Sequence, residues 1–294
     1  MEFAQLSDIV DYCSRSGKDM AEAMLDYEIA NKGLTREQVY ASLKRVLLVM
    51  EESVDQGLTE QVITPSGMLQ NWAKTVYAHP VETLGPALKK ATARAIAVGE
   101  VNACMGRIAA APTAGSAGIM PAVLVTMMEE HGIVREKILD ALLVSSAIGL
   151  VFARNSSFAG SEAGCMGETG SAAAMAAGSI TYLLGGTNPQ ILEAVSFALK
   201  ASMGLVCDPV AGLVEEPCTT RNAVGVANAF VSAQMALSGI RSLIPADEVI
   251  AATKEVGDLM SPRLKESAQG GLANTPTGRE IQKRVFEAKR SDKR

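Results

Sequence analysis

The chain contains a succession of segments in which apolar residues recur at helical spacing, and no sustained alternation of apolar and polar residues. Strands and hairpins call for period-two alternation, or for a two-residue turn between β-branched runs. Since neither pattern is found, we expect an all-α protein whose helices are joined by glycine-rich loops. The predicted helical segments are residues 5–30, 36–57, 85–105, 118–130, 134–152, 170–184, 188–203, 222–239 and 246–259.

Several helix ends carry their own local signals. Thr35 is an expected N-cap, and Gln38 stands at the third helical position of a capping box. Pro189 and Pro245 indicate helix starts, because proline suits the first turn. His131 precedes a glycine and is expected at a helix C-terminus, as a structural residue. Aromatic residues make up only 4% of the chain, so the core must be built from small and aliphatic residues.

The 294 residues show no internal repeat and no linker, so we expect one catalytic domain over residues 1–294. Residues 1–60 are more charged than the rest and are expected to form peripheral helices. The tail, at about residues 289–294, is expected to be frayed.

Charge and cysteine content exclude several classes of protein. The net charge is −5 and the largest basic block is the tail KRSDKR, which argues against nucleic-acid binding. The polar, acidic N-terminus does not resemble a signal peptide, and five widely spaced cysteines do not suggest a disulfide scaffold. We therefore expect a cytoplasmic protein. Residues 108–128 and 222–240 are free of charge, but their prolines, glycines and amides favour buried helices over membrane spans.

Three cysteines lie in glycine-rich segments that are far apart in the sequence. Cys165 lies in SEAGCMGETGSA, while Cys207 and Cys218 flank the turn-rich segment DPVAGLVEEP. Thiolates are soft metal ligands, and glycine gives a ligand loop the freedom to aim them. The pattern favours a metal-cluster site, although free cysteines also occur as small buried apolar residues. Zinc more often uses paired Cys-x-x-Cys ligands, which are absent. Cys104 is expected in the core, and Cys13 is expected to be incidental.

The loop APTAGSAG at residues 111–118 precedes an apolar helical segment. A helix N-terminus with free backbone N–H groups suits a carboxylate or phosphate, and the hydroxyls of Thr113 and Ser116 could add donors beside Gly115. A simple turn with a serine cap is the alternative. Carboxylates near the cysteines could act as a base, but the sequence does not choose among Glu162, Glu168, Asp208, Glu215 and Glu216.

Taken together, these segments resemble the α chains of bacterial two-chain iron–sulfur L-serine dehydratases. The resemblance extends from the N-terminal helices to the tail. Its longest matches are the blocks around the loop at 111–122 and the cysteines at 204–218. The matching segments are EVNACMG (100–106), APTAGSAGIMPA (111–122), GLVCDPVAGLVEEPC (204–218), RNAVGVANA (221–229) and GGLANTPTGRE (270–280).

The resemblance implies a carbon–nitrogen lyase of serine degradation that eliminates water from L-serine to give pyruvate and ammonia. It implies a [4Fe-4S] cluster held by Cys165, Cys207 and Cys218, with a fourth iron open to the substrate's hydroxyl. It also implies a separate β chain, in a heterodimer or larger assembly. No general base is identified, which leaves the partner chain as one source. The implied substrate-binding residues are Thr113, Gly115, Ser116, Asn102, Asn155, Arg221 and Ser66.

One departure from the family pattern leaves the substrate open. Members usually carry a Gly-Gly-Asp loop before the helix that leads to EVNA, whereas this chain reads TPSGMLQNWAKTVY at residues 64–77 and keeps only Ser66-Gly67. A lyase of the same family that acts on another hydroxy or thiol amino acid is therefore an alternative. Two alternatives belong to other functional classes: a non-catalytic iron–sulfur protein and a helical interaction module without a cluster.

Overall fold

The computed structural model describes residues 1–81 and 83–291, which form helices joined by loops. Within these ranges there is no strand, and only two isolated bridges pair extended residues, Ile63 with Gln70 and Cys207 with Lys265. The expected all-α fold is therefore confirmed. The α-helices are α1 (Leu6–Ser16), α2 (Met20–Lys32), α3 (Arg36–Thr59), α4 (Trp72–Ala78), α5 (Pro86–Ala103), α6 (Ile119–His131), α7 (Arg135–Asn155), α8 (Gly160–Cys165), α9 (Ser171–Leu183), α10 (Asn188–Ser202), α11 (Cys218–Leu237), α12 (Ala246–Leu259) and α13 (Pro276–Ser291).

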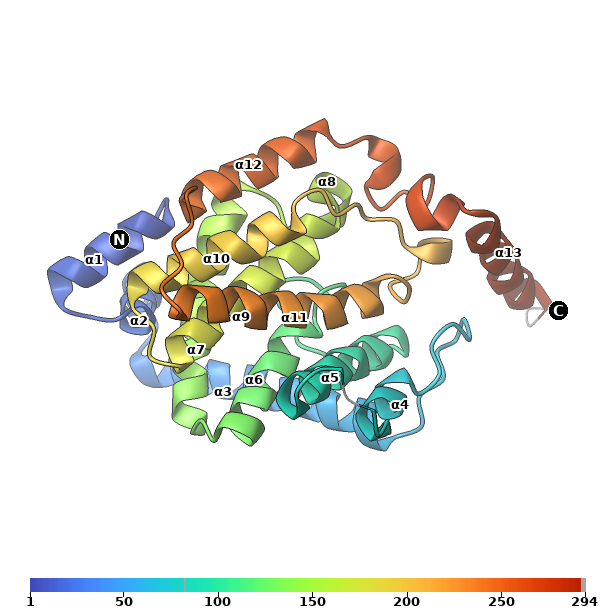
Figure 1. The fold of residues 1–294 in the computed structure, drawn as a ribbon, viewed down its shortest axis with the longest axis horizontal. Coiled ribbons are helices and arrows are strands. Elements are labelled where there is room, and N and C mark those ends of the chain that lie inside the picture. The colour runs from blue at the N-terminus through green and yellow to red at the C-terminus, as the bar shows by residue number, and fades with distance from the viewer. Residues whose placement is uncertain (82, 292–294) are drawn as a thin grey trace.

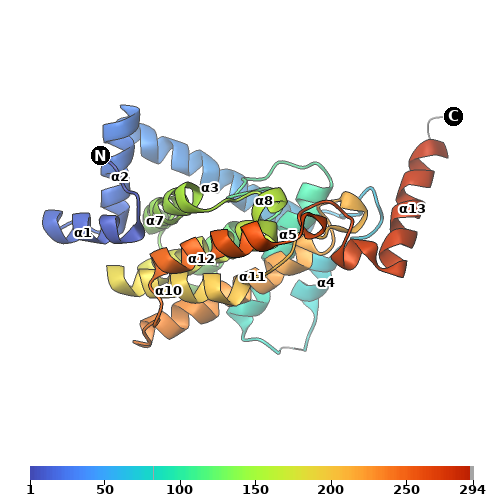
Figure 2. The ribbon, with the colours of Figure 1, turned by 90° about the horizontal axis from the view of Figure 1, so that it is seen from above.

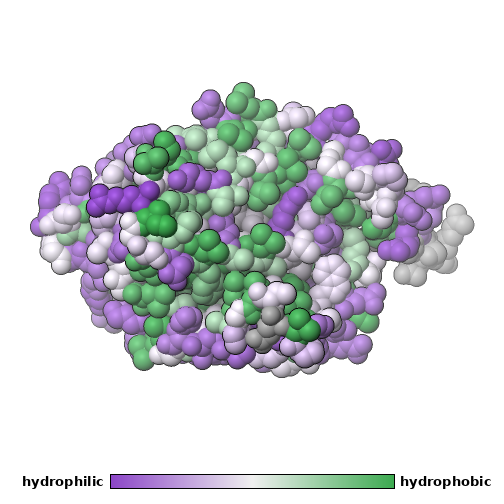
Figure 3. All heavy atoms as spheres, viewed as in Figure 1, coloured by the Kyte–Doolittle hydropathy of each residue, from purple (hydrophilic) through white to green (hydrophobic). Residues whose placement is uncertain are grey.

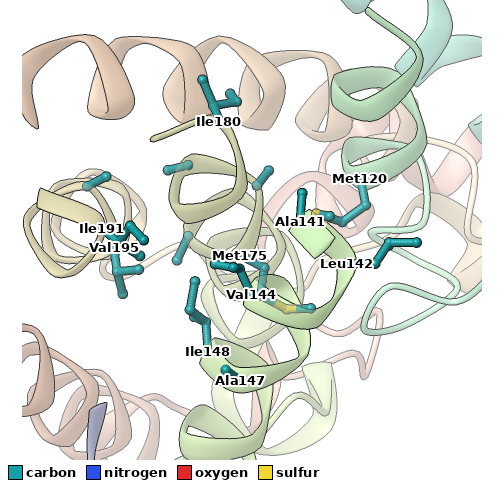
Figure 4. Packing of buried hydrophobic residues seen from close by; sticks show 14 of the residues in the cluster. Met120, Ala141, Leu142, Val144, Ala147, Ile148, Met175, Ile180, Ile191 and Val195 are labelled. Carbon is teal, nitrogen blue, oxygen red and sulfur yellow. The ribbon is translucent and has the colours of Figure 1, made fainter. Parts of the chain in front are cut away.

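Helix α9 lies at the centre and packs against α6, α7, α10 and α11 (Figure 1). All of its residues from Ser171 to Thr181 are buried. Gly178 contacts Ile148 of α7 so closely that a Cβ would collide with it, and Met175 lies beside Val144 in the same interface (Figure 4). Small side chains thus let the helices approach closely, which explains how a chain poor in aromatic residues builds a dense core.

Helices α1 and α2 lie together at one end of the molecule (Figures 1 and 2). Buried residues of both helices belong to the same apolar cluster as α9. The N-terminus of α1 is held by α12, because the amides of Leu6 and Ser7 donate to the carboxylate of Asp247 at 2.7 Å and 3.1 Å. The N-terminal helices are peripheral in position, and they also contribute to the main core.

The expected segment 5–30 is divided into α1 and α2. Gly17 ends α1 in the left-handed conformation at φ 69°, and Asp19 caps α2 by accepting from the amide of Glu22. The capping box at the start of α3 is confirmed: Gln38 N donates to Thr35 Oγ1 at 3.3 Å, and Thr35 N donates to Gln38 Oε1 at 2.9 Å. Helix α3 continues two residues past the expected end at Gly57.

The two charge-free segments differ in burial. No helix in the described ranges is long and apolar enough to cross a membrane. Helix α6 is buried from Ile119 to Met127 and ends at His131, as expected. Helix α11 is buried on one side only, because Val224 and Val231 are 68% and 54% exposed. Apolar atoms extend over the middle of the face on which α11 lies (Figure 3).

Three α-helices were not expected from the sequence: α4, α8 and α13. The N-terminus of α4 is capped from a distance, because Trp72 N and Ala73 N donate to the carboxylate of Glu100 at 2.6 Å and 3.2 Å. Helix α13 projects at the end opposite to α1 (Figures 1 and 2). It continues to Ser291, and the last three residues of the expected frayed tail lie outside the described residues. Short helical turns are η1 (Met166–Gly170, a π-turn), η2 (Val210–Gly212), η3 (Pro262–Leu264) and η4 (Gly271–Asn274).

Candidate functional site

The three cysteines of the glycine-rich segments are buried and lie in one region. Cys165 ends α8, Cys207 lies in the loop after α10, and Cys218 begins α11. Burial raises the pKa of each thiol, and the negative charges of Glu168 and Cys165 raise the pKa values of Cys207 and Cys218 further. The Cys207 and Cys218 thiols therefore lie close enough to Cys165 to interact with it electrostatically.

In the described residues, no three His, Cys, Asp or Glu side chains are arranged to hold one metal ion. The three thiols are soft donors, which is the ligand chemistry that iron–sulfur clusters use.

The backbone before Cys165 requires glycine. Gly164 has φ 66° and ψ −170°, and a Cβ on it would lie 2.7 Å from the carbonyl oxygen of Leu205. The next residue after the cysteine, Met166, donates its amide to that same carbonyl at 3.1 Å. The Cys165 segment is thus attached to the loop segment that leads to Cys207. A turn of π-helix, η1, follows at once, a feature frequent at functional sites.

Cys207 is fixed by the segment at residues 262–272. Its amide donates to Leu264 O at 2.9 Å, and its carbonyl accepts from Glu266 N at 2.8 Å. The following Asp208 is buried and accepts from Leu272 N at 2.6 Å. Gly271 packs directly on this carboxylate, with no room for a Cβ. The GGLAN part of the C-terminal motif therefore serves to hold the Cys207 loop.

Arg221 joins the cysteine segments to one another. Its guanidinium donates to Val206 O at 2.7 Å and pairs with Asp208 Oδ1 at 2.8 Å. It also lies close enough to Cys165 to oppose the rise in the pKa of that thiol, as does the hydroxyl of Thr169. Arg221 was expected to bind substrate, whereas in the structure its guanidinium is engaged by protein groups.

The loop before α6 is connected to the cysteine region through Asn222, which the sequence did not single out. The buried Asn222 side chain donates to Gly115 O and Cys218 O, both at 2.7 Å, and accepts from Gly118 N at 2.9 Å. Because Asn222 lies one turn after Cys218, it holds the loop against the start of α11.

Thr113 and Ser116 are linked inside this loop, with their hydroxyl oxygens 3.1 Å apart. Ser116 is fully buried, and no side chain caps α6, so the serine-cap alternative is wrong. Thr113 also donates to Glu168 Oε1 at 2.8 Å, and Glu168 Oε2 lies 3.8 Å from Cys207 Sγ. The expected carboxylate-binding loop and an expected cluster ligand therefore meet at one glutamate.

Comparison with known proteins identifies the family. The family model described as serine dehydratase alpha chain matches residues 15–273. The chain belongs to the serine dehydratase alpha chain family. It is 45% identical to the L-serine dehydratase alpha chain of Peptoniphilus asaccharolyticus, over 94% of this chain and 96% of that protein. It is 42% identical to the probable L-serine dehydratase alpha chain of Bacillus subtilis, over 97% and 95%.

A longer relative gives a second comparison. The L-serine dehydratase TdcG of Escherichia coli is 31% identical over 92% of this chain, but the match covers only 62% of the Escherichia coli protein. The expected resemblance to serine dehydratase α chains, and with it membership of an enzyme family, is confirmed by these matches.

The loop that departs from the usual pattern of the serine dehydratase family also reaches the site. Ser66 Oγ donates to Glu215 Oε2 at 2.5 Å and accepts from Met68 N at 3.0 Å. Glu215 is buried and lies between Cys207 and Cys218 in the sequence. Ser66 is therefore attached to the segment that joins two of the cysteines.

Two other residues expected to bind substrate differ in position. Asn102 is half-buried, and its side chain lies 3.3 Å from Ala114 O, beside the loop. Asn155 is exposed and donates to Ala4 O and Val151 O, both at 2.8 Å. The structure therefore brings Asn102 to the site, but it directs Asn155 to the N-terminal segment.

The remaining cysteines contrast with these three. Cys104 was expected in the core and is exposed, with its sulfur 3.6 Å from Ile63 O, so that expectation is wrong. It ends up outside because α5 stops at Ala103 and the chain turns there, with Met105 in the left-handed conformation at φ 62°. Cys13 is buried on α1 among apolar residues.

Proposed function

We propose that this chain is the α subunit of an iron–sulfur-dependent L-serine dehydratase, a carbon–nitrogen lyase that eliminates water from L-serine to give pyruvate and ammonia. Family membership and the names of the relatives support this activity. The observation that carries the proposal is that the loop at residues 111–118 meets the Cys207 thiol through Glu168 and the start of α11 at Cys218 through Asn222.

Cys165, Cys207 and Cys218 would hold a [4Fe-4S] cluster. When bound, such a cluster would supply Lewis-acid activation of the substrate's hydroxyl at an iron without a cysteine ligand. The burial of the three thiols and their mutual interaction support this assignment. All five cysteines are free, which is consistent with the reducing cytoplasm that we propose as the location.

The chain's own residues would bind and orient the substrate. The loop from Thr113 to Ser116 precedes α6, and the positive end of that helix favours a carboxylate. Asn102 lies beside this loop and could contribute a side-chain amide. Arg221 and Asp208 would act indirectly by fixing the cysteine segments.

A separate β chain would complete the enzyme. The match to the longer Escherichia coli protein leaves more than a third of that protein without a counterpart in this chain. The relatives named alpha chains have nearly the length of this chain, which supports a second polypeptide. No side chain here is assigned as the general base, and the β chain is its proposed source.

The test is an anaerobic assay of the purified chain with and without the β chain, following pyruvate formation from L-serine alongside iron and sulfide content. The proposal predicts about four irons per chain and pyruvate formation that is lost in air. Cys207→Ala should lose both cluster and activity, while Cys13→Ala should keep both because Cys13 lies in the apolar core. A Cys207→Ala protein with full iron content and activity would contradict the proposal.

The altered loop at residues 64–70 supports one variation of this function. Ser66 is bound to Glu215, and the usual Gly-Gly-Asp is absent. A panel of hydroxy and thiol amino acids in the same assay separates L-serine from another substrate. A bound cluster with no lyase activity on any of them would instead indicate a non-catalytic iron–sulfur protein.

A further inference from the structure

Glu168 connects two parts of the site that come from distant positions in the sequence. It lies in the π-turn, three residues after Cys165. One carboxylate oxygen accepts from Thr113 Oγ1 at 2.8 Å, and the other lies 3.8 Å from Cys207 Sγ. One half-buried carboxylate therefore spans the gap between the loop and the Cys207 segment.

Two glycines form a slot around this carboxylate. A Cβ on Gly115 would lie 2.9 Å from Oε1, and a Cβ on Gly160 would lie 2.8 Å from Oε2 and 2.9 Å from Cys207 Sγ. Neither glycine has a positive φ. A Cβ at either position would displace the Glu168 carboxylate, so the space that the carboxylate occupies, and not backbone conformation, favours glycine here.

The main chain of Glu168 is itself held in place. Ser171 Oγ donates to the Glu168 carbonyl at 3.0 Å, and Gly170 packs on Ser202 of α10, where a Cβ would lie 2.9 Å from that side chain. The Glu168 side chain therefore extends from a fixed point. The length of this side chain decides the distance between the Thr113 hydroxyl and the Cys207 sulfur.

We infer that Glu168 is a positioning residue that sets the spacing between the Thr113–Ser116 loop and the Cys207 thiol. What this spacing serves rests on the proposed function, in which the loop binds the substrate's carboxylate and Cys207 holds the cluster. Length and acceptor capacity are then the properties that matter. Glu168→Gln keeps the length and one acceptor oxygen, which can face Thr113 while its NH2 group faces Cys207. Glu168→Asp keeps the charge but is too short to reach both partners.

The first measurement is hydrogen exchange of the amides at residues 113–117 in the full chain, purified without oxygen. Glu168→Asp is expected to speed this exchange by about 10-fold to 100-fold, the effect of losing a hydrogen bond to a charged group, while Glu168→Gln stays within about 3-fold of wild type. Glu216→Asp is the matched control, because Glu216 is half-buried in the same region and faces Thr220 instead of the loop.

The second measurement separates KM from kcat for L-serine in the presence of the β chain. Glu168→Asp should raise KM by about 10-fold with iron and sulfide content unchanged, and Glu168→Gln should restore it. Gly115→Ala fills the slot from the side of the loop and should raise KM similarly. This variant covers the case in which Glu168→Asp does not fold.

The outcomes separate the two proposals. If Glu168→Asp matches wild type in loop exchange and in KM, Glu168 has no positioning role. If Glu168→Gln abolishes kcat while KM and loop exchange stay at wild-type values, the residue transfers a proton and the inference is overturned. If wild type forms no pyruvate but the exchange differs as expected, the proposed function fails and the positioning role stands.

Discussion

The helical core around α9 and the loop region around the three cysteines are held together in different ways. In the core, several buried hydroxyls bond to carbonyls of their own helix, as Ser145 does to Leu142 O and Thr181 to Ala177 O, while Ser179 of α9 bonds to Ala141 O of the adjacent α7. In the loop region, side chains bond to segments far away in the sequence. Asn222 reaches Gly115, 107 residues away, and Ser66 reaches Glu215, 149 residues away.

The helical core and the loop region also differ in backbone conformation. The core is regular helix, whereas the loop region places Gly164, Ala211 and Glu266 at positive φ. A non-glycine residue in that conformation costs about 1 kcal/mol or more, so other contacts must hold it there. The core is thus specified by many contacts that can partly replace one another, and the loop region by a few that cannot. Four predictions test this difference.

Gly178→Val should give the largest loss of stability. The new side chain would collide with Ile148 in the close contact between α7 and α9, which should lower the free energy of unfolding by about 3 kcal/mol. Denaturant unfolding measures it. Gly85→Ala is the control, since a Cβ there meets no atom within 4 Å among the described residues other than its chain neighbours. Equal stabilities for the two variants would show that the core tolerates this contact as easily as the surface does.

Asp208→Asn should destabilise the loop region by about 2 kcal/mol, because the buried charge that pairs with Arg221 and strengthens the bond from Leu272 N is lost. The effect should be local, so limited proteolysis should cut faster within residues 262–275 while α9 stays protected. Asp258→Asn, which alters an exposed pair with Lys254, should leave cleavage unchanged. Faster cleavage in α9 than in residues 262–275 would contradict the local picture.

Ser66→Ala should have a smaller effect on stability, about 1 kcal/mol, because a partly buried hydrogen bond to Glu215 is lost. We expect a clear rise in the KM for L-serine and only a small fall in the unfolding midpoint, since the loop lies against the Cys207–Cys218 segment. Ser14→Ala on α1, which removes a hydroxyl bonded within its own helix, is the control. An unchanged KM would separate this loop from substrate binding.

The smallest effect concerns acid stability at the α1–α2 end. Burial alone would raise the pKa of Asp26, but hydrogen bonds from Lys18 and Tyr12 outweigh it and hold the pKa below its ordinary value of 3.8. A lowered pKa stabilises the fold above that value, and the contribution disappears as pH falls through the folded pKa. Asp26→Asn should therefore flatten the loss of stability below about pH 4, in unfolding curves recorded from pH 6 to pH 3.

Asp11→Asn, at an exposed carboxylate on α1, is the control for this pH dependence. The same loss of stability at low pH in wild type and Asp26→Asn would show that the Asp26 carboxylate and its bonds to Lys18 and Tyr12 contribute nothing measurable.

Apolar periodicity predicted most of the helices, because a helix that is buried on one side carries apolar residues at a regular local spacing. Helix α4 was not predicted because its cap is Glu100, a residue of another helix that only the folded chain brings near. Helix α8 and the π-helical turn η1 were not predicted because Gly164 interrupts the apolar pattern. Helical expectations therefore failed where a contact from a distant part of the chain, or a glycine within the segment, decides the structure.

The site shows the same limit. Glycine-rich surroundings pointed to the three cysteines, since ligand loops and close approach both favour glycine. Asn155 lies only ten residues before Cys165, but as the last residue of α7 its side chain bonds to Ala4 instead. The roles of Asn222 and Glu168 depend on partners 107 and 55 residues away, and no local pattern could show them.

The bond between α12 and the first turn of α1 has a consequence for synthesis of the protein. Leu6 N and Asp247 are separated by 241 positions, so this contact has a very high sequence separation. During translation the N-terminal helix leaves the ribosome long before its carboxylate partner exists. Until Asp247 emerges, α1 lacks these two hydrogen bonds, so the first helix to be made is among the last to be completed. Nascent chains that stop before α12 should therefore leave the apolar side of α1 partly exposed.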